Sequence, residues 1–486
     1  MNIFKKKSLC AALAGIGALG AAGAAQAVNL NPDGLGQVLI YPYYTVRNDG
    51  AGNAFNSLLS IVNSTASVKA VKVRFLEGKN SVEVLDFNLF LSPKDVWTTA
   101  VIPMGAGAGI VTTDKSCTIP AIPSGGQGFV NFALGPDGAG TGLDRTTEGY
   151  VEIIEMAAFA DDSTTAANVT HVNGVPPGCA KETDSLALSE ALPPTGGLFG
   201  GMSLINVNSG SDYTEDAVAL DNFSNASLYS SAGSLLPNLT EASPAVSVVT
   251  TNGFTYTSTW GTGTADPVSA VLMHDHIMNE YVLDTLTNSG TDWVVTMPTK
   301  RFYVSNGTGP AALPFQRNFN KTDGACDDVQ LAIYDREENT SSTPISFSPP
   351  PPVATNALCW EANVVTFNNS NVLGSANIAN ITTPSGFQDG WLDIGFFDPA
   401  AAPVHSLGTN PTIVTDILGG TATSPATYIG LPVVGFAVQS FANGAITVGG
   451  VTTLSNYGGN FVQKGTRTIN SAVPLVGAAP AKSKRK

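Results

Sequence analysis

A His274-Asp275-His276 triplet, with Glu280 four residues further on, is the best metal-ligand pattern in the sequence. On a β-strand the two histidines would share a face and could bind zinc or copper together. On a helix they would be about 200° apart and point in different directions. Apolar residues from Val271 to Val282 recur near helical spacing and predict a helix over residues 266–284. The metal hypothesis therefore stays with His274, His276 and Glu280, the last two sharing a helix face.

Two acidic segments are candidates for calcium. The loop 135–144 is rich in glycine and carries Asp137 and Asp144, but it lacks the alternating acids of a calcium loop. An ordinary turn explains it better. The second segment surrounds Cys326, with Asp323, Asp327 and Asp328. We predict no cofactor, and leave calcium or a transition metal as the alternative.

Catalytic signatures are weak. The sequence has no Gly-x-Ser-x-Gly elbow and only four histidines, which limits nucleophilic triads. Glu152 and Glu155 lie in one predicted strand, where residues three apart face opposite sides, so they do not form a glycosidase pair. We therefore predict no catalytic residue.

An aromatic set could stack on sugar rings. Aromatic side chains in a sandwich are more often core or rim than platform, so sugar binding is an alternative reading. The residues concerned are Tyr41, Tyr43, Tyr44, Trp97, Trp260, Trp293, Trp360 and Trp391.

The N-terminus predicts export. Three lysines at 5–7 precede an apolar, Gly- and Ala-rich run that ends in Ala25-Gln26-Ala27, the three parts of a cleavable signal peptide over residues 1–27. The run is too short to span a bilayer, and no later stretch predicts an integral membrane span. Removal of three lysines and no acids would change the net charge from -15 to -18. Such an acidic chain is repelled by nucleic acid.

Four cysteines follow the signal: Cys117, Cys179, Cys326 and Cys359. An even number in an exported chain indicates two disulfides. Of the three pairings, Cys117–Cys179 and Cys326–Cys359 are favoured, because each pair falls within one half of the chain. A four-thiolate zinc site is disfavoured, since no Cys-x-x-Cys spacing occurs.

Short alternating strands dominate the remaining sequence. We predict an all-β fold of antiparallel, immunoglobulin-like β-sandwich domains, with one short helix and long Gly/Ser/Thr/Asn-rich loops. The expected organisation is a sandwich over 28–160, a loop-rich insertion or subdomain over 161–265, a helix plus second sandwich over 266–475, and a basic tail over 476–486. A polyproline loop, Pro349–Pro352, falls between the last two cysteines.

Three stretches carry a resemblance to a known group of proteins. They are Tyr41-Pro42-Tyr43-Tyr44 through the segment 69–78 to Leu91-Ser92-Pro93, the segment 296–304, and the run 359–363. In these the chain resembles uncharacterised exported proteins of proteobacteria. The resemblance implies a Gram-negative envelope or exterior and no particular activity.

Together these observations predict an exported, non-enzymatic structural, surface or adhesive protein in the periplasm, on the cell surface or in the medium. A carbohydrate-binding or carbohydrate-active protein is the first alternative, and a periplasmic metal-binding protein the second. Self-association or a surface glycan is the expected kind of partner.

Overall fold

The computed structural model describes residues 26–49, 52–307, 309–341, 345–347, 356–396 and 405–472. Most of the predicted signal peptide, the Pro349–Pro352 loop and the basic tail lie outside these residues. Strands make up 49% and helices 8% of the structure, and nearly all strand pairs are antiparallel, so the predicted mostly β fold is confirmed. The immunoglobulin-like arrangement stays a prediction.

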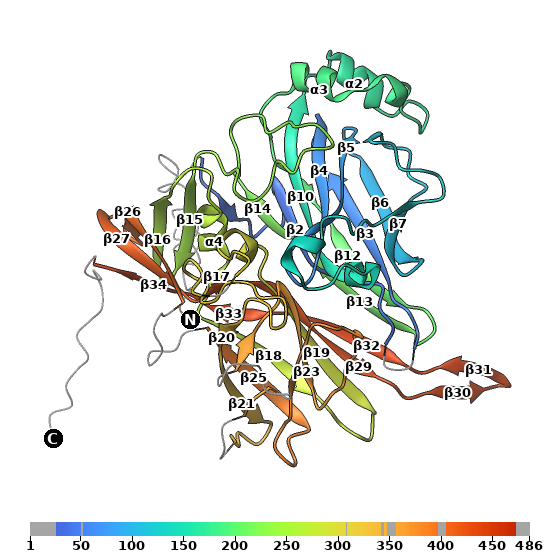
Figure 1. Ribbon diagram of the computed structural model, residues 1–486, viewed down its shortest axis with the longest axis vertical. Helices are drawn as coiled ribbons and strands as arrows, with labels where there is room; N and C mark the ends of the chain where they lie inside the picture. Colours follow the sequence, from blue (N-terminus) through green and yellow to red (C-terminus); the bar gives the residue numbers. More distant parts are fainter. Residues whose placement is uncertain are drawn as a thin grey trace, which may run out of the picture.

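The N-terminal lobe is formed by two seven-stranded sheets (Figure 1). The first sheet has the order β1 (Asn29–Leu30), β14 (Val218–Asp221), β2 (Val38–Thr45), β10 (Glu148–Phe159), β4 (Val68–Glu77), β5 (Glu83–Leu91) and β8 (Thr118–Ile119). The second has the order β13 (Ser211–Asp216), β12 (Gly201–Asn206), β3 (Asn56–Asn63), β6 (Val96–Met104), β7 (Gly107–Val111) and β9 (Gln127–Gly128), and β11 (Leu198–Phe199) also pairs with β3.

The C-terminal lobe contains three larger sheets. One runs β24 (Ile378–Ile381), β23 (Ala362–Phe367), β19 (Ser289–Thr296), β29 (Val434–Phe441), β32 (Tyr457–Val462). The next runs β21 (Gln330–Asp335), β25 (Asp389–Gly395), β18 (His276–Val282), β33 (Lys464–Thr466). The third runs β15 (Val246–Thr251), β16 (Phe254–Thr259), β26 (Ser406–Asp416), β27 (Thr421–Ile429), β34 (Thr468–Ser471).

One hydrophobic core spans both lobes. Val73 and Ile153 of the first N-terminal sheet pack in the same buried cluster as Leu59 of the second sheet. Val294, Val364, Leu373, Phe436 and Val438 of the C-terminal lobe belong to that cluster as well. Burial of apolar area is the main stabilising term in folding, so the lobes stabilise each other.

The predicted helix over 266–284 is wrong beyond its first two turns. Helix α4 spans Asp266–Leu272. Two short strands follow it, β17 (Met273–His274) and β18. In β18 Ile277, Asn279 and Tyr281 are buried while the residues between them are more exposed, which is the two-residue period of a strand. Pairing with β25 overrides the weaker helical spacing.

The expectation of a single short helix also needs correction. Two more short helices, α2 (Thr164–Val169) and α3 (Asp184–Glu190), lie in the segment expected to be loop-rich. Each begins after a hydroxyl residue that caps it. The Ser163 side chain accepts a hydrogen bond from the backbone N–H of Ala166, and Thr183 does the same for Leu186.

Candidate functional site

The histidines of the predicted metal site attach to different sheets. His274 pairs with Leu431 in a two-stranded ladder, whereas His276 pairs with Gly395 and Thr466. The His274 ring contacts the carbonyl of Leu272, and burial, aided by the charge of Arg467, lowers its pKa to about 3. The His276 Nδ1 lies 3.0 Å from Asp393 Oδ1.

Glu280 lies four residues from His276 along one strand, a spacing of about 13 Å. Its side chain is exposed. In the described part of the chain, no three His, Cys, Asp or Glu residues are grouped so as to hold a metal.

Protein cations occupy the acidic loops considered for calcium. Arg145 binds both carboxylate oxygens of Asp137. Arg317 binds Asp328 with two contacts of 2.9 Å, and the Lys300 Nζ lies 2.8 Å from Asp327 Oδ2. These carboxylates form ion pairs within the protein instead of binding calcium.

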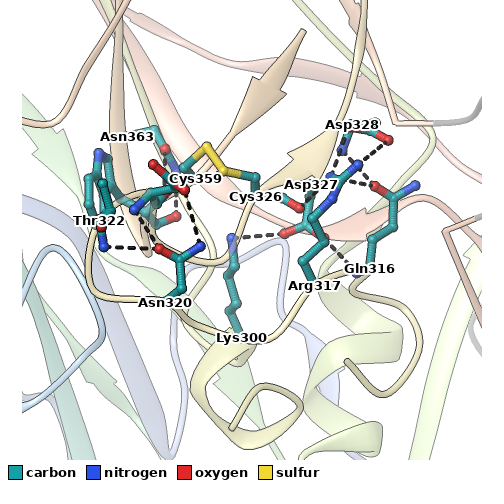
Figure 2. Close-up of a disulfide and its surroundings, with 12 residues drawn as sticks. Lys300, Gln316, Arg317, Asn320, Thr322, Cys326, Asp327, Asp328, Cys359 and Asn363 are labelled. Carbon is teal, nitrogen blue, oxygen red and sulfur yellow. Dashed lines mark hydrogen bonds and ion pairs between the residues drawn. A yellow bond between two sulfur atoms is a disulfide. The ribbon is translucent and has the colours of Figure 1, made fainter. Parts of the chain in front are cut away.

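Both predicted disulfides are present. Cys117 is bonded to Cys179 and Cys326 to Cys359. Figure 2 shows the second disulfide beside the Lys300–Asp327 ion pair. Both Lys300 and Asp327 are buried, so their charges are paired away from water.

A charged seam joins the two lobes next to this disulfide. We define it by the buried residues Glu77, Arg145, Glu148, Lys300, Asp327 and Glu361. Glu148 of β10 accepts hydrogen bonds from the Ser375 hydroxyl at 2.6 Å and from the backbone N–H of Ala376 at 2.9 Å. The backbone N–H of Ala362 donates to the carbonyl of Gly78 at 2.8 Å. Each of these contacts crosses from one lobe to the other.

Glu361 is a buried seam residue whose carboxyl group is only partly hydrogen-bonded. Its Oε2 has no hydrogen-bond partner among the described residues, and burial raises its pKa to about 8 against the opposing charge of Lys300. The carboxyl group is therefore protonated at neutral pH. A neutral acid here reduces the cost of burial that a charged one would carry.

The predicted aromatic platform is wrong for six of its eight members. Tyr41, Tyr43, Tyr44, Trp97, Trp260 and Trp293 are buried. Trp360 is half-buried, and Lys79 lies over its ring. Trp391 is 39% exposed and stacks on Tyr334, with ring centroids 4.4 Å apart. The buried six belong to the hydrophobic cores, for example Trp97 in the core that spans the lobes.

A cavity of about 350 Å³ lies between the lobes. We call it the interlobe cleft. One wall comes from the N-terminal lobe and the other from four segments of the C-terminal lobe. The lining residues are Asp49, Phe55, Ser209, Ser211, Tyr213, Asn288, Ser289, Gly290, Ser370, Asn371, Val372, Ser440, Phe441, Ala442, Asn456 and Tyr457.

The chemistry of this lining is neutral and polar. It holds hydroxyls, amides and one carboxylate, Asp49, with no lysine, arginine or histidine. At its rim Tyr457 stacks on Phe441, with ring centroids 4.8 Å apart, and Tyr457 is 52% exposed. Small-molecule sites have cavities of this size, in which apolar surface is combined with a few placed polar groups.

Two enclosed polar atoms of residues that line the cleft make no full hydrogen bond with the described residues, the Tyr213 hydroxyl and the Asn371 Oδ1, although the Ser211 and Ser440 hydroxyls act on that of Tyr213. A buried polar atom without a hydrogen bond costs about 1–3 kcal/mol. Both atoms are enclosed by protein, so a ligand in the cavity would reach them only if these side chains turned toward it.

Neighbouring residues hold the cleft in shape. The Asp49 carboxylate accepts from the backbone N–H of Asn53 at 2.8 Å and from the Asn206 amide at 3.0 Å. Across the cleft, the Asn456 amide donates to the carbonyl of Ser209 at 2.8 Å. At Gly290 a Cβ atom would meet the Ser370 Cβ at 3.0 Å, so a larger residue would push into the floor.

Sequence reasoning missed the cleft completely. Its lining comes from separate segments that meet only through strand pairing. The one local signal is the run Asn368-Asn369-Ser370-Asn371, in which all three asparagines have positive φ. Asparagine tolerates this left-handed conformation better than most residues, so the run indicated a tight turn but no ligand.

Comparisons with known proteins give no assignment: no protein-family model, no curated protein and no solved structure matches the chain. No helix in the described residues is long and apolar enough to cross a membrane.

Proposed function

We propose that this chain is an exported, non-enzymatic surface or adhesive protein that binds a neutral carbohydrate in the interlobe cleft. The observation that carries the proposal is a cleft lining of hydroxyls and amides, with a single carboxylate and no basic group, beside a stacked aromatic pair. Sugars present hydroxyl groups for the polar atoms and apolar C–H faces for the rings. A lining without basic groups disfavours phosphates and carboxylates as ligands.

Binding is favoured over hydrolysis. Glycosidases use two carboxyl groups flanking the scissile bond, and the cleft lining has only Asp49. Asp292, whose pKa burial raises to about 6, is fully buried and accepts hydrogen bonds from Ser370 and Leu373. It does not line the cleft, so it supports the Ser370–Val372 turn and is not available to a sugar.

An oxidising compartment suits the two disulfides, because such bonds persist in secreted and periplasmic proteins. This supports the envelope or the cell exterior as the location. The seam and the shared core hold the cleft walls at a fixed spacing, as a preorganised binding site requires.

The test is a glycan-array screen of the purified chain, followed by calorimetric titration of the best neutral glycan. Tyr213→Phe removes one hydroxyl and should weaken binding about tenfold, the value of one buried hydrogen bond. Tyr457→Ala should weaken it further by removing the exposed ring. Trp391→Ala, on the outer face of the C-terminal lobe, is the matched aromatic control and should bind as the wild type does.

Absence of any glycan binding would overturn the proposal. So would a glycan whose affinity is lost in Trp391→Ala and kept in Tyr213→Phe, because the site would then lie at the Tyr334–Trp391 stack.

A further inference from the structure

A β-hairpin projects from the body of the molecule beside the C-terminal lobe (Figure 1). It consists of β30 (Ala445–Val448) and β31 (Val451–Leu454), joined by Gly449 and Gly450. The two strands pair only with each other, and all eight of their residues are exposed. A two-stranded hairpin is at best marginally stable by itself in water, so an extended arm of this kind is an incomplete sheet.

One face of the hairpin is apolar. Ile446 lies opposite Thr453, and Val448 opposite Val451. The side chains of Ile446, Val448 and Val451 therefore share this face with one polar residue, Thr453, and Val448 is 69% exposed. The opposite face carries Ala445 and Leu454 together with Thr447 and Thr452, whose hydroxyls are 2.9 Å apart.

The edges of the hairpin are not protected. Proteins usually guard exposed strand edges with charged residues, especially lysine, or with proline. From residue 442 to residue 463 the sequence has neither a charged residue nor a proline. The outer backbone groups of β30 and β31 are thus available to another strand.

The distribution of charge indicates what kind of strand would pair with these edges. The chain has a net charge of -15, so two copies repel each other over most of their surface. The hairpin is exempt from this repulsion, because no charge lies between Asp416 and Lys464. A basic partner would be recognised through acidic side chains, and the hairpin has none. An uncharged strand edge is, by contrast, complementary to itself in an antiparallel pair.

We propose that the hairpin joins two copies of this chain by pairing edge to edge with the same hairpin of a second copy, so that Ile446, Val448 and Val451 of the two copies lie side by side on one face of a four-stranded sheet. The contact is isologous, with the same surface used on both sides. It is a strand addition at a sheet edge, in which main-chain hydrogen bonds supply affinity and side chains supply the register. This goes beyond the carbohydrate proposal and does not depend on it.

The test is sedimentation velocity of the purified chain over a wide concentration series. We expect a monomer that converts to a dimer as concentration rises. The double variant Ile446→Lys with Val448→Lys should remain monomeric at every concentration. The matched control, Ile417→Lys with Leu418→Lys, places the same two charges on the exposed turn between β26 and β27 and should dimerise as the wild type does.

Amide hydrogen exchange of the wild type keeps the test independent of how well a variant folds. Amides of residues 445–454 should exchange more slowly in the dimer than in the monomer. A wild type that stays monomeric throughout, a dimer that survives in the hairpin variant, or a dimer without protection in the hairpin would each overturn the proposal.

Discussion

The same interface between the lobes is built in two different ways. At the charged seam, Lys300 and Asp327 are in direct contact and excluded from water. At the interlobe cleft, the lobes face each other across a hollow lined by hydroxyls and amides. Hydrogen bonds cross from lobe to lobe at both places, whereas the ion pairs of the seam, Lys300–Asp327 and Arg145–Glu77, each join residues of one lobe.

This difference suggests two roles: the seam holds the lobes together, and the cleft is suited to binding a ligand. A buried charge is tolerated only when its partner is present, so the ion pairs keep each side of the seam in shape, and the hydrogen bonds of Glu148 and Gly78 hold the two sides together. Neutral hydroxyls and amides exchange one partner for another at small cost, which suits a surface that is alternately hydrated and occupied. Variants at the two ends should therefore fail in different ways.

The largest effect is expected at the seam ion pair. Lys300→Met leaves the Asp327 carboxylate buried without a cation and should lower the free energy of unfolding by about 3–5 kcal/mol, measured by urea denaturation. Adding Asp327→Asn removes the stranded charge and keeps an acceptor for the Gln316 N–H, so stability should largely recover. If Lys300→Met alone were as stable as the wild type, the seam would tolerate substitution as the cleft does.

The seam disulfide should come next. Replacing Cys326 and Cys359 by alanine should cost about 2–4 kcal/mol in the same measurement. The matched control is the Cys117–Cys179 pair, which closes a longer loop: its cysteines are 62 residues apart against 33. Loop entropy alone would make the longer bridge worth about 0.6 kcal/mol more. We expect the loss of Cys326–Cys359 to cost more, because this shorter bridge also fixes the seam. A larger cost for the loss of Cys117–Cys179 would show that the shorter bridge does not stabilise the seam.

Glu361 should make the seam sensitive to pH. Its pKa in the folded chain is about 8, above the 4.5 of an ordinary glutamate, so between these values the folded chain holds a proton that the unfolded chain has released. Stability should fall as pH rises from about 4.5 through 8. We expect Glu361→Gln to abolish a fall of roughly 2–3 kcal/mol, since a pKa change of one is worth about 1.4 kcal/mol and relaxation reduces the full value. Parallel stability curves for the two proteins would contradict this.

The smallest effect is expected in the cleft. Tyr213→Phe removes a buried hydroxyl that makes no full hydrogen bond with the described residues, so the free protein should become more stable by about 1 kcal/mol, measured by thermal unfolding. Loss of stability would show that the hydroxyl is bonded within the fold. In that case the cleft residues would hold the two lobes together, as those of the seam do, and would not be free for a ligand.

Local pattern was a sufficient guide for some elements of this fold. The predicted strand that carries Glu152 and Glu155 is found as β10, at the centre of its sheet, between β2 and β4. Both disulfide pairings were predicted because each joins cysteines within one half of the chain.

The predictions that failed depend on pairing between segments far apart in the sequence. Apolar residues between 271 and 282 fit a helix by spacing, yet β25 and β33 take this segment as a strand. The cleft could not be predicted for the same reason. Tyr213 and Asn371 are ordinary residues until the two lobes bring them to one cavity.

The core shared by the lobes has a practical meaning for anyone who cuts this chain into fragments. A piece ending near residue 260 would expose the side of the N-terminal lobe that Val294, Val364 and Phe436 cover. The complementary piece would expose those same three side chains to water. Exposed apolar patches of this kind promote aggregation, so neither fragment is a suitable expression unit. The smallest piece that can be handled as a protein runs from Val28, whose N–H pairs with Val246, to the last strand at Ser471.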